Sequence, residues 1–388
     1  MARLGDICER RIDTIKSTYE GDIDYIDISS VDNQRKEITQ TQSMSIVDAP
    51  SRAKQLVFPG DILVSTVRPN LNAVALVTEN ADNTLVASTG YCVLRCLPDA
   101  DNRYVFYFCQ SPAFIEKMVA QATGASYPAV TSAIVKECTI PLPPLEEQRR
   151  IAALLDKVSD LIAKRRVQLD KLDLLVKARF VEMFGDPETN PMNWPIVCIG
   201  AITRTIDSGW SGNGTQREKK VGEIAVLKVS AVTKGYFIPE ECKVLDDQGN
   251  IKKYVFPQKG DLLFSRANTK EMVGATAIIR EDYPELILPD KLWKIRFSNV
   301  TNVVYMKYIL SSKAIRSKFS EASTGTSGSM YNVSMEKFKA IQIPMPEISI
   351  QNQFASFVES VERSKLTIQR SLDKLEALKK ALLQQYFG

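Results

Sequence analysis

The sequence repeats itself at long range. The segment Val57-Phe58-Pro59-Gly60-Asp61 recurs, with two inserted residues, as Val255-Phe256-Pro257 followed by Gly260-Asp261. From Gly60 onward the paired motifs lie 200 to 203 residues apart: Tyr104 and Tyr305, Tyr107 and Tyr308, Thr123-Gly124 and Thr324-Gly325, Gln148 and Gln351, Leu169 to Leu172 and Leu372 to Leu375, Phe184-Gly185 and Phe387-Gly388. A repeat of this length predicts two similar domains related by pseudo-symmetry. Because pseudo-symmetric proteins tend to bind pseudo-symmetric ligands, duplex DNA is the leading candidate ligand.

The composition narrows the class of protein. The 388 residues are 44% apolar and 25% charged, as in an ordinary globular protein. No apolar run approaches the roughly 18–20 residues that span a bilayer, and the N-terminus lacks the apolar core of a signal peptide, so we expect no membrane association and a cytoplasmic location. Seven scattered cysteines fit reduced thiols and no metal site. Since the chain has no histidine, Ser-His-Asp and Cys-His catalysis and histidine-containing zinc sites are excluded.

The charge is distributed unevenly. The whole chain carries +4, but residues 1–145 have 13 basic and 17 acidic residues, a net −4, whereas residues 186–345 have 22 and 17, a net +5. A nucleic-acid-binding face in the first segment would therefore be a local basic patch.

Each repeat begins with a mixed α/β domain. Turn residues bound runs of β-branched and aromatic residues near 25–28, 61–65, 73–77 and 91–95, which predict strands, and residues 101–121 carry a helical pattern. The second copy repeats this plan, with strands near 224–230, 261–265, 274–280 and 292–297 and a helix near 302–320.

A long helix is predicted after each domain. Positions spaced 4 and 3 apart form a heptad seam in which eight of ten residues are apolar in each copy: Ile151, Leu155, Val158, Ile162, Arg165, Leu169, Leu172, Val176, Arg179 and Met183; then Phe354, Val358, Val361, Lys365, Ile368, Leu372, Leu375, Lys379, Leu382 and Tyr386. Each helix would be roughly 50 Å long. We infer that the two helices pair with each other in antiparallel fashion; the alternative is that each packs only on its own domain. Gly185 and three prolines at 187, 191 and 195 end the first helix and mark a short boundary between the copies.

Two motifs in combination carry a resemblance. Pro143-Pro144-Leu145-Glu146-Glu147-Gln148 precedes the first helix, and Phe184-Gly185-Asp186-Pro187 with Asn190-Pro191 follows it. This arrangement resembles the central conserved region of the specificity (S) subunit of type I restriction–modification enzymes, and the two Gly-Asp segments resemble that family's target recognition domains. The second copy departs from the pattern, with Glu347-Ile348-Ser349-Ile350-Gln351 in place of the first motif.

The resemblance implies an α+β fold of two pseudo-symmetric mixed α/β target recognition domains, separated by two long helices that form an antiparallel coiled coil. The segments would be target recognition domain 1 (1–145), the central conserved helix (146–185), target recognition domain 2 (186–346) and the C-terminal conserved helix (347–388). Each domain would read one half of a bipartite site in double-stranded DNA. The helices would space the domains and dock two modification (M) methyltransferase subunits, and the resemblance admits restriction (R) subunits as further partners. The chain would be non-catalytic and bind no cofactor, because S-adenosylmethionine belongs to the M subunits.

Three kinds of loop are candidate DNA contacts, since Arg, Lys, Asn, Ser and Thr bind phosphates and base edges. The first kind follows a predicted strand in each copy: Ser65, Thr66, Arg68, Asn70 and Asn72; and Ser265, Arg266, Asn268 and Lys270. The second follows the Thr-Gly motif, where glycine and hydroxyl groups suit a phosphate: Ser126 and Tyr127; and Ser327, Tyr331 and Asn332. The third is a basic, glycine-rich loop: Trp210, Arg217, Lys219 and Lys220. Ordinary solvated loops would have a similar composition.

Two other functions compete with this interpretation. An adenine methyltransferase would need an Asn/Asp-Pro-Pro-aromatic loop and a glycine-rich cofactor motif, and neither occurs. A Pro-Asp…Glu-x-Lys nuclease would need Glu-x-Lys at a plausible spacing downstream of Pro98-Asp99 or Pro289-Asp290, and Glu218-x-Lys220 stands alone. A coiled-coil scaffold that binds only protein would have no use for the duplicated polar loops.

Overall fold

The computed structural model divides into two compact units. Unit 1 comprises Met1–Leu169 and Thr367–Gly388, and unit 2 comprises Asp170–Leu366. The structure describes residues 1–16, 18–78, 83–325 and 331–388. The predicted DNA contact Ser327 lies outside the described residues.

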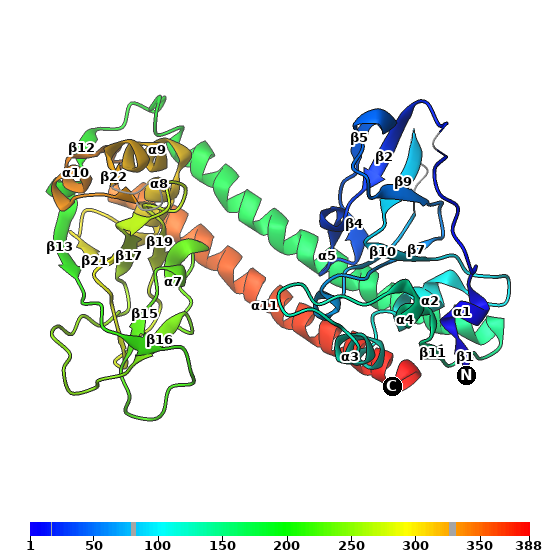
Figure 1. Cartoon of the computed structure of the whole chain (residues 1–388). Helices are drawn as coiled ribbons and strands as arrows, with labels where there is room; N and C mark the ends of the chain where they lie inside the picture. The colour runs from blue at the N-terminus through cyan, green and yellow to red at the C-terminus, as the bar shows by residue number, and fades with distance from the viewer. Residues whose placement is uncertain (17, 79–82, 326–330) are drawn as a thin grey trace. The chain divides into compact units, whose positions relative to one another are not determined.

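Unit 1 contains a four-stranded mixed sheet and a three-stranded antiparallel sheet. The first has the order β5-β2-β9-β6, and its parallel pair β2–β9 lies at the centre (Figure 1). The second has the order β10-β7-β8. The strands of unit 1 are β1 (Ala2–Arg3), β2 (Asp22–Ile26), β3 (Val31–Asp32), β4 (Glu37–Ile38), β5 (Gln42–Ser45), β6 (Ala53–Leu56), β7 (Ile62–Ser65), β8 (Val74–Leu76), β9 (Thr84–Ser88), β10 (Tyr91–Leu94) and β11 (Thr139–Ile140).

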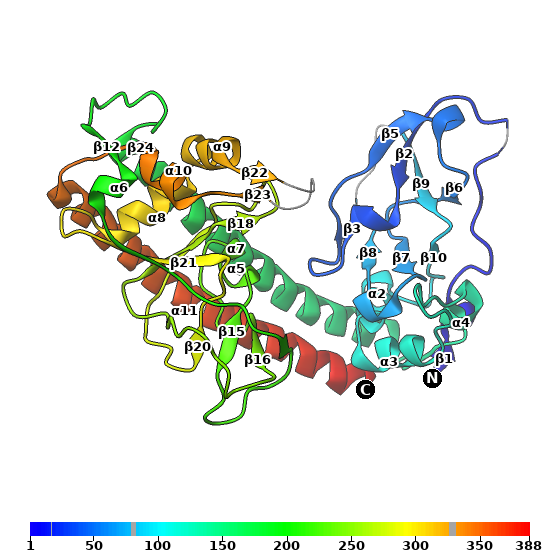
Figure 2. The same cartoon turned by 60° about the vertical axis from the view of Figure 1, so that its left-hand side comes forward.

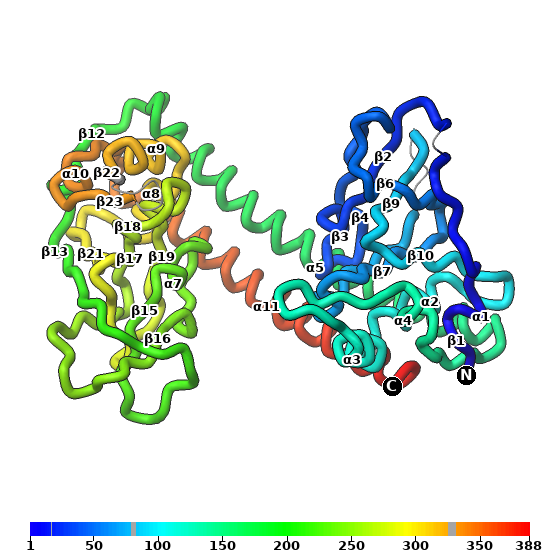
Figure 3. Tube along the Cα trace, viewed as in Figure 1, coloured from blue at the N-terminus to red at the C-terminus, as the bar shows by residue number. Residues whose placement is uncertain are grey.

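Unit 2 repeats this plan. The parallel pair β15–β20 corresponds to β2–β9, and the sheet β13-β21-β17-β19 contains the counterparts of β10, β7 and β8 (Figure 3). The strands of unit 2 are β12 (Ile196–Cys198), β13 (Thr203–Ser208), β14 (Gly214–Thr215), β15 (Ala225–Leu227), β16 (Cys242–Leu245), β17 (Leu262–Ser265), β18 (Ala267–Asn268), β19 (Thr276–Ile278), β20 (Leu286–Ile287), β21 (Leu292–Phe297), β22 (Thr324–Gly325), β23 (Tyr331–Asn332) and β24 (Gln342–Pro344).

The helical pattern after the second sheet is two helices in each copy rather than one. In unit 1 the first helix ends at Phe108, and Ser111 caps the second, because its hydroxyl accepts a hydrogen bond from the Phe114 amide. Ser312 does the same for Ile315 in unit 2. The helices are α1 (Leu4–Ile7), α2 (Asn102–Phe108), α3 (Pro112–Ala120), α4 (Ser132–Lys136), α5 (Leu145–Phe184), α6 (Ile199–Ile202), α7 (Ser230–Thr233), α8 (Val303–Ser311), α9 (Lys313–Ala322), α10 (Met335–Ala340) and α11 (Ile348–Phe387), with 3-10 turns η1 (Ile28–Ser30), η2 (Ile46–Asp48) and η3 (Pro69–Leu71).

The long helices α5 and α11 pack against each other. In unit 1, Val158 and Ile162 of α5 form a buried cluster with Leu372 of α11. In unit 2, Val176 of α5 shares a core with Val358 of α11. Within each unit, the N-terminal part of one helix meets the C-terminal part of the other, so the predicted antiparallel pairing and the α+β architecture are confirmed.

The C-terminal end of each long helix completes a domain core of the other repeat. Phe387, at the end of α11, lies 5.0 Å from the Tyr104 ring in the core of unit 1. Phe184, at the end of α5, lies 4.8 Å from the equivalent Tyr305 ring in unit 2. The heptad seam predicted Met183 and Tyr386 at these positions, and the core residues are the next ones in the sequence. The seam shifts because the α-helix has 3.6 residues per turn and the heptad repeat has 3.5.

A buried glutamine fixes the start of each long helix. Gln148 accepts a hydrogen bond from the Asp101 amide (2.9 Å) and donates to the carbonyls of Pro143 (2.8 Å) and Asp99 (3.2 Å). Gln351 makes the same set of bonds in unit 2, accepting from the Asn302 amide and donating to the Pro346 and Val300 carbonyls. The glutamine that recurs in the motif therefore joins the first turn of α5 or α11 to the N-terminus of α2 or α8.

The boundary after α5 is an ordered turn. Gly185 has φ +75°, and a Cβ there would lie 2.5 Å from the Pro191 ring. The Asn190 side chain bonds both the amide and the carbonyl of Trp194, and the Trp194 indole N–H donates to the Phe184 carbonyl at 3.2 Å. Among the described residues, no helix is both long enough and apolar enough to cross a membrane.

The reciprocal closure of the two cores predicts which unit each helix end stabilises. Truncating a buried phenylalanine typically costs about 3–5 kcal/mol. We therefore expect Phe387→Ala to raise amide hydrogen exchange in α2 of unit 1, although position 387 belongs to the second repeat, and Phe184→Ala to raise it in α8 of unit 2. Hydrogen-exchange mass spectrometry of the two variants checks this. Faster exchange in α8 for Phe387→Ala would contradict it.

Candidate nucleic-acid interface

The repeated Gly-Asp motif is a structural turn that starts a core strand. In unit 1 the buried Asp61 carboxylate accepts hydrogen bonds from the Phe58 amide (2.9 Å) and from two nitrogens of Arg95 (2.9 and 2.8 Å). In unit 2 Asp261 accepts from the Gln258 amide at 2.7 Å and pairs with Arg296 and Lys294. The motif thus fixes the beginning of β7 and β17, and the candidate contacts follow the opposite ends of these strands.

The loop after β7 has a buried support and an exposed tip. The Ser65 hydroxyl donates to the Val67 carbonyl and the Thr66 hydroxyl to the Gly90 carbonyl, and both side chains are buried. Arg68 has φ +50°, and its amide donates to the Pro128 carbonyl at 2.7 Å. Arg68 and Asn70 are exposed.

The two polar segments that the sequence predicts in unit 1 lie together. Val67 forms a β-bridge with Ala129, and Thr123 bridges the same residue. The Arg68 guanidinium lies over the Tyr127 ring, 4.6 Å from its centroid, and Tyr127 is 67% exposed. Ser126, next to it, is also exposed. Segments about 60 residues apart in sequence therefore form one surface with a cation, an aromatic ring and amide and hydroxyl groups.

Asn72, by contrast, faces inward. Its side chain donates to the Cys109 carbonyl at 2.8 Å and accepts from the Lys36 ammonium at 2.8 Å, and its backbone has φ +47°. Burial lowers the pKa of Lys36 to about 8.

Unit 2 brings its equivalent segments together by the same backbone pairing. Strand β18, which carries Asn268, pairs with β23, which carries Tyr331 and Asn332, and β23 pairs with β22 (Figure 2). Ser265 is fully buried. Arg266 is half-buried, donates to the Asp290 carbonyl at 2.9 Å and lies 6.0 Å from the Trp293 ring. Lys270 is exposed.

Acidic neighbours partly neutralise the basic loop at 209–220. Arg217 makes a two-pronged contact with Glu223 at 2.8 Å, and Lys219 pairs with Glu285 at 2.9 Å. The Trp210 side chain packs against the small core around Leu245. Lys220 is exposed and forms no ion pair within the described ranges, which leave out residues 17, 79–82 and 326–330. The spacing of the residues in the sequence did not predict these ion pairs.

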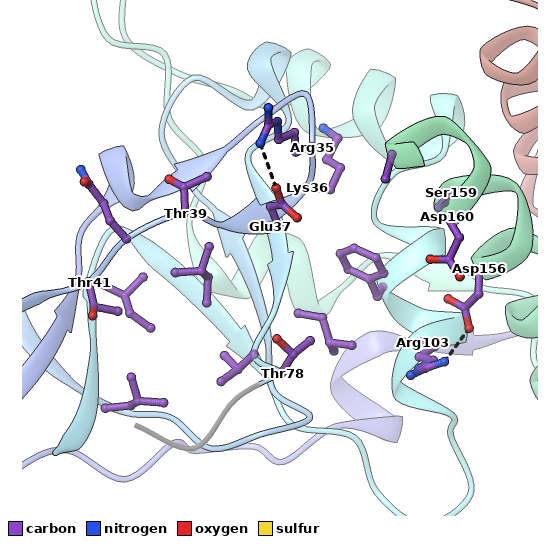
Figure 4. A pocket seen from close by; sticks show the side chains of 18 of the residues that line it. Arg35, Lys36, Glu37, Thr39, Thr41, Thr78, Arg103, Asp156, Ser159 and Asp160 are labelled. Carbon is purple, nitrogen blue, oxygen red and sulfur yellow. Dashed lines mark hydrogen bonds and ion pairs between the residues drawn. The ribbon is translucent and has the colours of Figure 1, made fainter. Parts of the chain in front are cut away.

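A cleft in unit 1 was not predicted from the sequence. It has a volume of about 870 Å³ and lies between the segment 35–43, helix α2 and the first half of α5 (Figure 4). Arg103 pairs with Asp156 at 2.7 Å on its α5 side, where Tyr107 also donates to Asp156 at 2.8 Å. A half-buried lysine, Lys36, is its main chemical feature. Lysines are usually exposed, so nothing in the sequence distinguished Lys36 from an ordinary surface lysine or predicted the cleft.

The chain's thiols and carboxylates form no metal centre in the described part of the structure, where no group of three or more His, Cys, Asp or Glu side chains could hold a metal ion. Burial raises the pKa of the Cys92 thiol to about 11, so it stays protonated near neutral pH.

Comparisons with known proteins agree on one family. The family model described as the type I restriction modification DNA specificity domain matches residues 1–171 and 192–379. The specificity subunit of the type I restriction enzyme EcoEI from Escherichia coli is 27% identical over 205 residues, covering 51% of this chain and 34% of that protein. The EcoKI specificity subunit from Escherichia coli K12 is 21% identical over 367 residues, covering 90% of this chain and 78% of that protein.

Solved structures share the fold. A chain from work on complex assembly and conformational transition of the type I restriction–modification system matches with a TM-score of 0.60 and 23% identity, covering 100% of this chain and 96% of that one. The type I restriction–modification S subunit from M. genitalium matches with a TM-score of 0.54 and 13% identity, covering 100% of this chain and 95% of that one.

Two asparagines in the loop after β7 test whether its buried residues support the fold while its exposed tip does not. We expect Asn72→Ala to lower the free energy of unfolding by about 2 kcal/mol or more, because it leaves the Cys109 carbonyl unpaired and places alanine at positive φ. Asn70→Ala, at an exposed position, should change it by less than about 0.5 kcal/mol. Chemical denaturation of both variants measures this. Equal losses in both variants would contradict the division.

Proposed function

Because the chain belongs to the family of type I restriction–modification DNA specificity subunits, we propose that each of its repeats reads one half of a bipartite site in double-stranded DNA. Specificity subunits of this family are non-catalytic and bind no cofactor, and the methyltransferase activity lies in the M subunits. Residues 1–145 and 186–346 would be the two target recognition domains. A chain with this function would work in the cytoplasm, where it meets DNA.

One observation carries the proposal. In both units the loop after the Gly-Asp strand pairs with the segment after the Thr-Gly motif, so the same frame presents two polar loops on one surface. The frame repeats, but the side chains on it differ. Two similar frames with different side chains are suited to two half-sites of different sequence.

In the first repeat the exposed residues Arg68, Asn70, Ser126 and Tyr127 would touch DNA. Arg68 has the donors for a guanine edge or a phosphate, and the ring of Tyr127 holds its guanidinium in place. The buried Ser65, Thr66 and Asn72 would support this tip from below. They remain predicted members of the site.

In the second repeat the proposed contacts are cationic and amide side chains. Lys270 and Lys220 suit phosphates, and Asn268, Tyr331 and Asn332 lie on the paired strands β18 and β23. Arg266, Arg217 and Lys219 are engaged within the protein, so each would have to exchange a protein partner for DNA. Trp210, Ser265 and Ser327 complete the predicted set.

We further propose that α5 and α11 dock two M subunits. Both helices keep large apolar side chains exposed, which a partner helix could cover: Leu154, Leu161, Leu174, Leu175 and Val181 on α5, and Leu366 and Leu378 on α11. R subunits would join the resulting complex. The competing function is a protein-binding scaffold without DNA recognition. Such a scaffold would use these helices but would not need the polar loops.

Reconstitution tests the assignment as a non-catalytic specificity subunit. We expect the purified chain, incubated with S-adenosylmethionine and DNA, to transfer no methyl groups. Adding M subunits should give adenine methylation at a bipartite sequence, which single-molecule sequencing of the DNA would map. Methyl transfer by the isolated chain would overturn the assignment. Methylation by the M subunits with the same sequence preference in the absence of this chain would favour the scaffold.

The half-site model makes a residue-level prediction. In the reconstituted complex, Arg68→Ala should cost roughly 1–3 kcal/mol of discrimination at bases of one half-site and leave the other half unchanged. Methylation of oligonucleotides with single base changes measures this. Lys54→Ala removes an exposed cation elsewhere in unit 1 and is the matched control. Relaxed specificity in both halves would refute the assignment of one repeat to one half-site.

A further inference from the structure

A second charged cleft lies in unit 2, away from the candidate DNA loops. It has a volume of about 380 Å³, and three cations line it: Arg204, Lys259 and Arg296. No carboxylate belongs to its lining. Arg204 and Lys259 are exposed, and neither forms an ion pair among the residues that the structure describes. A concave site with this excess of positive charge favours an anion.

The charge behind the cleft is also positive. Asp261 is the carboxylate that Arg296 contacts, at 2.6 Å, and it also pairs with Lys294 at 3.2 Å. One buried negative charge therefore faces two positive charges, and 45% of the Arg296 side chain stays exposed. The neighbouring Asp282 accepts a hydrogen bond from the Lys259 amide and does not line the cleft.

The backbone adds hydrogen-bond donors and a positive dipole end. Thr301, Asn302 and Val303 line the cleft where the nine-residue helix α8 begins, and the N-terminus of a helix favours anions. Ser298 also lines it. The Ser298 hydroxyl is the single buried side-chain oxygen or nitrogen without a hydrogen-bond partner in the described part of the chain. Buried hydroxyls are normally hydrogen-bonded, so this group is an unused donor beside the cleft.

The equivalent cleft of unit 1 lacks this excess of positive charge. Its cleft of about 490 Å³ is lined by Asp61 and Asp101 as well as by Arg95 and Arg149. Arg95 pairs with both Asp61 and Glu9. Lys294 corresponds to Val93, and Lys259 is one of the two residues inserted before Gly260. Arg204, two residues after the end of α6, corresponds to Glu9, two residues after the end of α1, so the first repeat has an acidic residue at this position. The cationic cleft is therefore a feature of the second repeat and not of the shared frame.

The position of the cleft favours a protein ligand over DNA. Strand β17 runs from Leu262, just after Gly260 in the lining, to Ser265, just before the candidate DNA loop, so the cleft and the loop lie at opposite ends of the strand. The cleft adjoins the first turns of α11, because the Asn302 side chain donates to Asn352 at 2.9 Å. A chain lying along the start of α11 would reach it.

We propose that this cleft binds a carboxylate-bearing segment of a protein partner that lies along the first turns of α11. The guanidinium of Arg204 and the ammonium of Lys259 pair with the carboxylate oxygens, and the positive end of the α8 dipole also stabilises them. The proposal is independent of how the loops read DNA, since none of these residues belongs to them.

A charge-removal pair of variants of the full chain tests the site. The double variant Arg204→Gln/Lys259→Gln removes two cations of the cleft and leaves the Asp261–Arg296 pair intact. Lys252→Gln/Lys253→Gln removes two exposed cations elsewhere in unit 2 and is the control. Binding of a hexaglutamate peptide, measured by isothermal titration calorimetry at low salt, should weaken roughly tenfold or more in the first variant and little in the control. Equal peptide affinity in all three proteins overturns the proposal.

A second arm separates protein from DNA as the source of the anion. The affinity for a 30-base-pair duplex is measured at several salt concentrations. We expect the cleft variant and the wild type to have the same salt dependence. If the cleft bound DNA phosphates instead, losing two contacts would reduce the slope of log K against log salt by about 2 in the cleft variant but not in the control. That result would overturn the carboxylate assignment.

Discussion

The structure depends on two aromatic contacts that cross between the repeats. Phe387 of α11 packs on Tyr104 in the core of unit 1, and Phe184 of α5 packs on Tyr305 in the core of unit 2. Each tyrosine also donates its hydroxyl to the last strand before a long helix, to the Pro141 carbonyl at 2.9 Å or the Pro344 carbonyl at 2.6 Å. One side chain thus joins the core, the start of one long helix and the end of the other. This explains why Tyr104 and Phe-Gly recur at a fixed offset: each copy needs the partner motif of the other copy.

The same region fixes the long helices in direction. Gln148 and Gln351 join their first turns to the start of α2 and α8, while Phe387 and Phe184 join their last turns to the same short helices. Helix length and pairing are therefore set by residues in the cores. Because Arg68 and Lys270 are exposed, we expect substitutions at these positions to leave the frame unaffected. A specificity subunit needs this separation, since its recognised sequence can then vary while its partners stay the same.

The sequence was sufficient to predict the frame, because repeated positions such as Gly60-Asp61, Tyr104 and Gln148 each perform one local task that a motif can encode. The long helices and their pairing followed from periodicity, the strands from runs of β-branched and aromatic residues, and the α+β architecture from the family resemblance. Other features depended on contacts between distant residues. The burial of Asn72 depends on Lys36 and Cys109, the pairing of Arg217 depends on Glu223, and the closure by Phe184 depends on Tyr305, 121 positions away. The break at Ser111 was an exception, because serine followed by proline is a recognisable helix start that the helical pattern of 101–121 obscured.

The two repeats share a frame but differ in how tightly they hold the equivalent arginine. Arg68 rests on the exposed ring of Tyr127, whereas Arg266 is half-buried and bonds the Asp290 carbonyl. A stacked guanidinium keeps its donors open, while a guanidinium bonded to a carbonyl has to give up that bond to contact a base, at a cost of about 1 kcal/mol or more. The proposed contacts in the first repeat are therefore centred on an arginine, and those in the second on lysine and amide side chains. The net charges of −4 for residues 1–145 and +5 for residues 186–345 follow the same division. With its acidic surroundings, the first repeat can attract phosphate only locally, so specific contacts have to supply most of its binding energy.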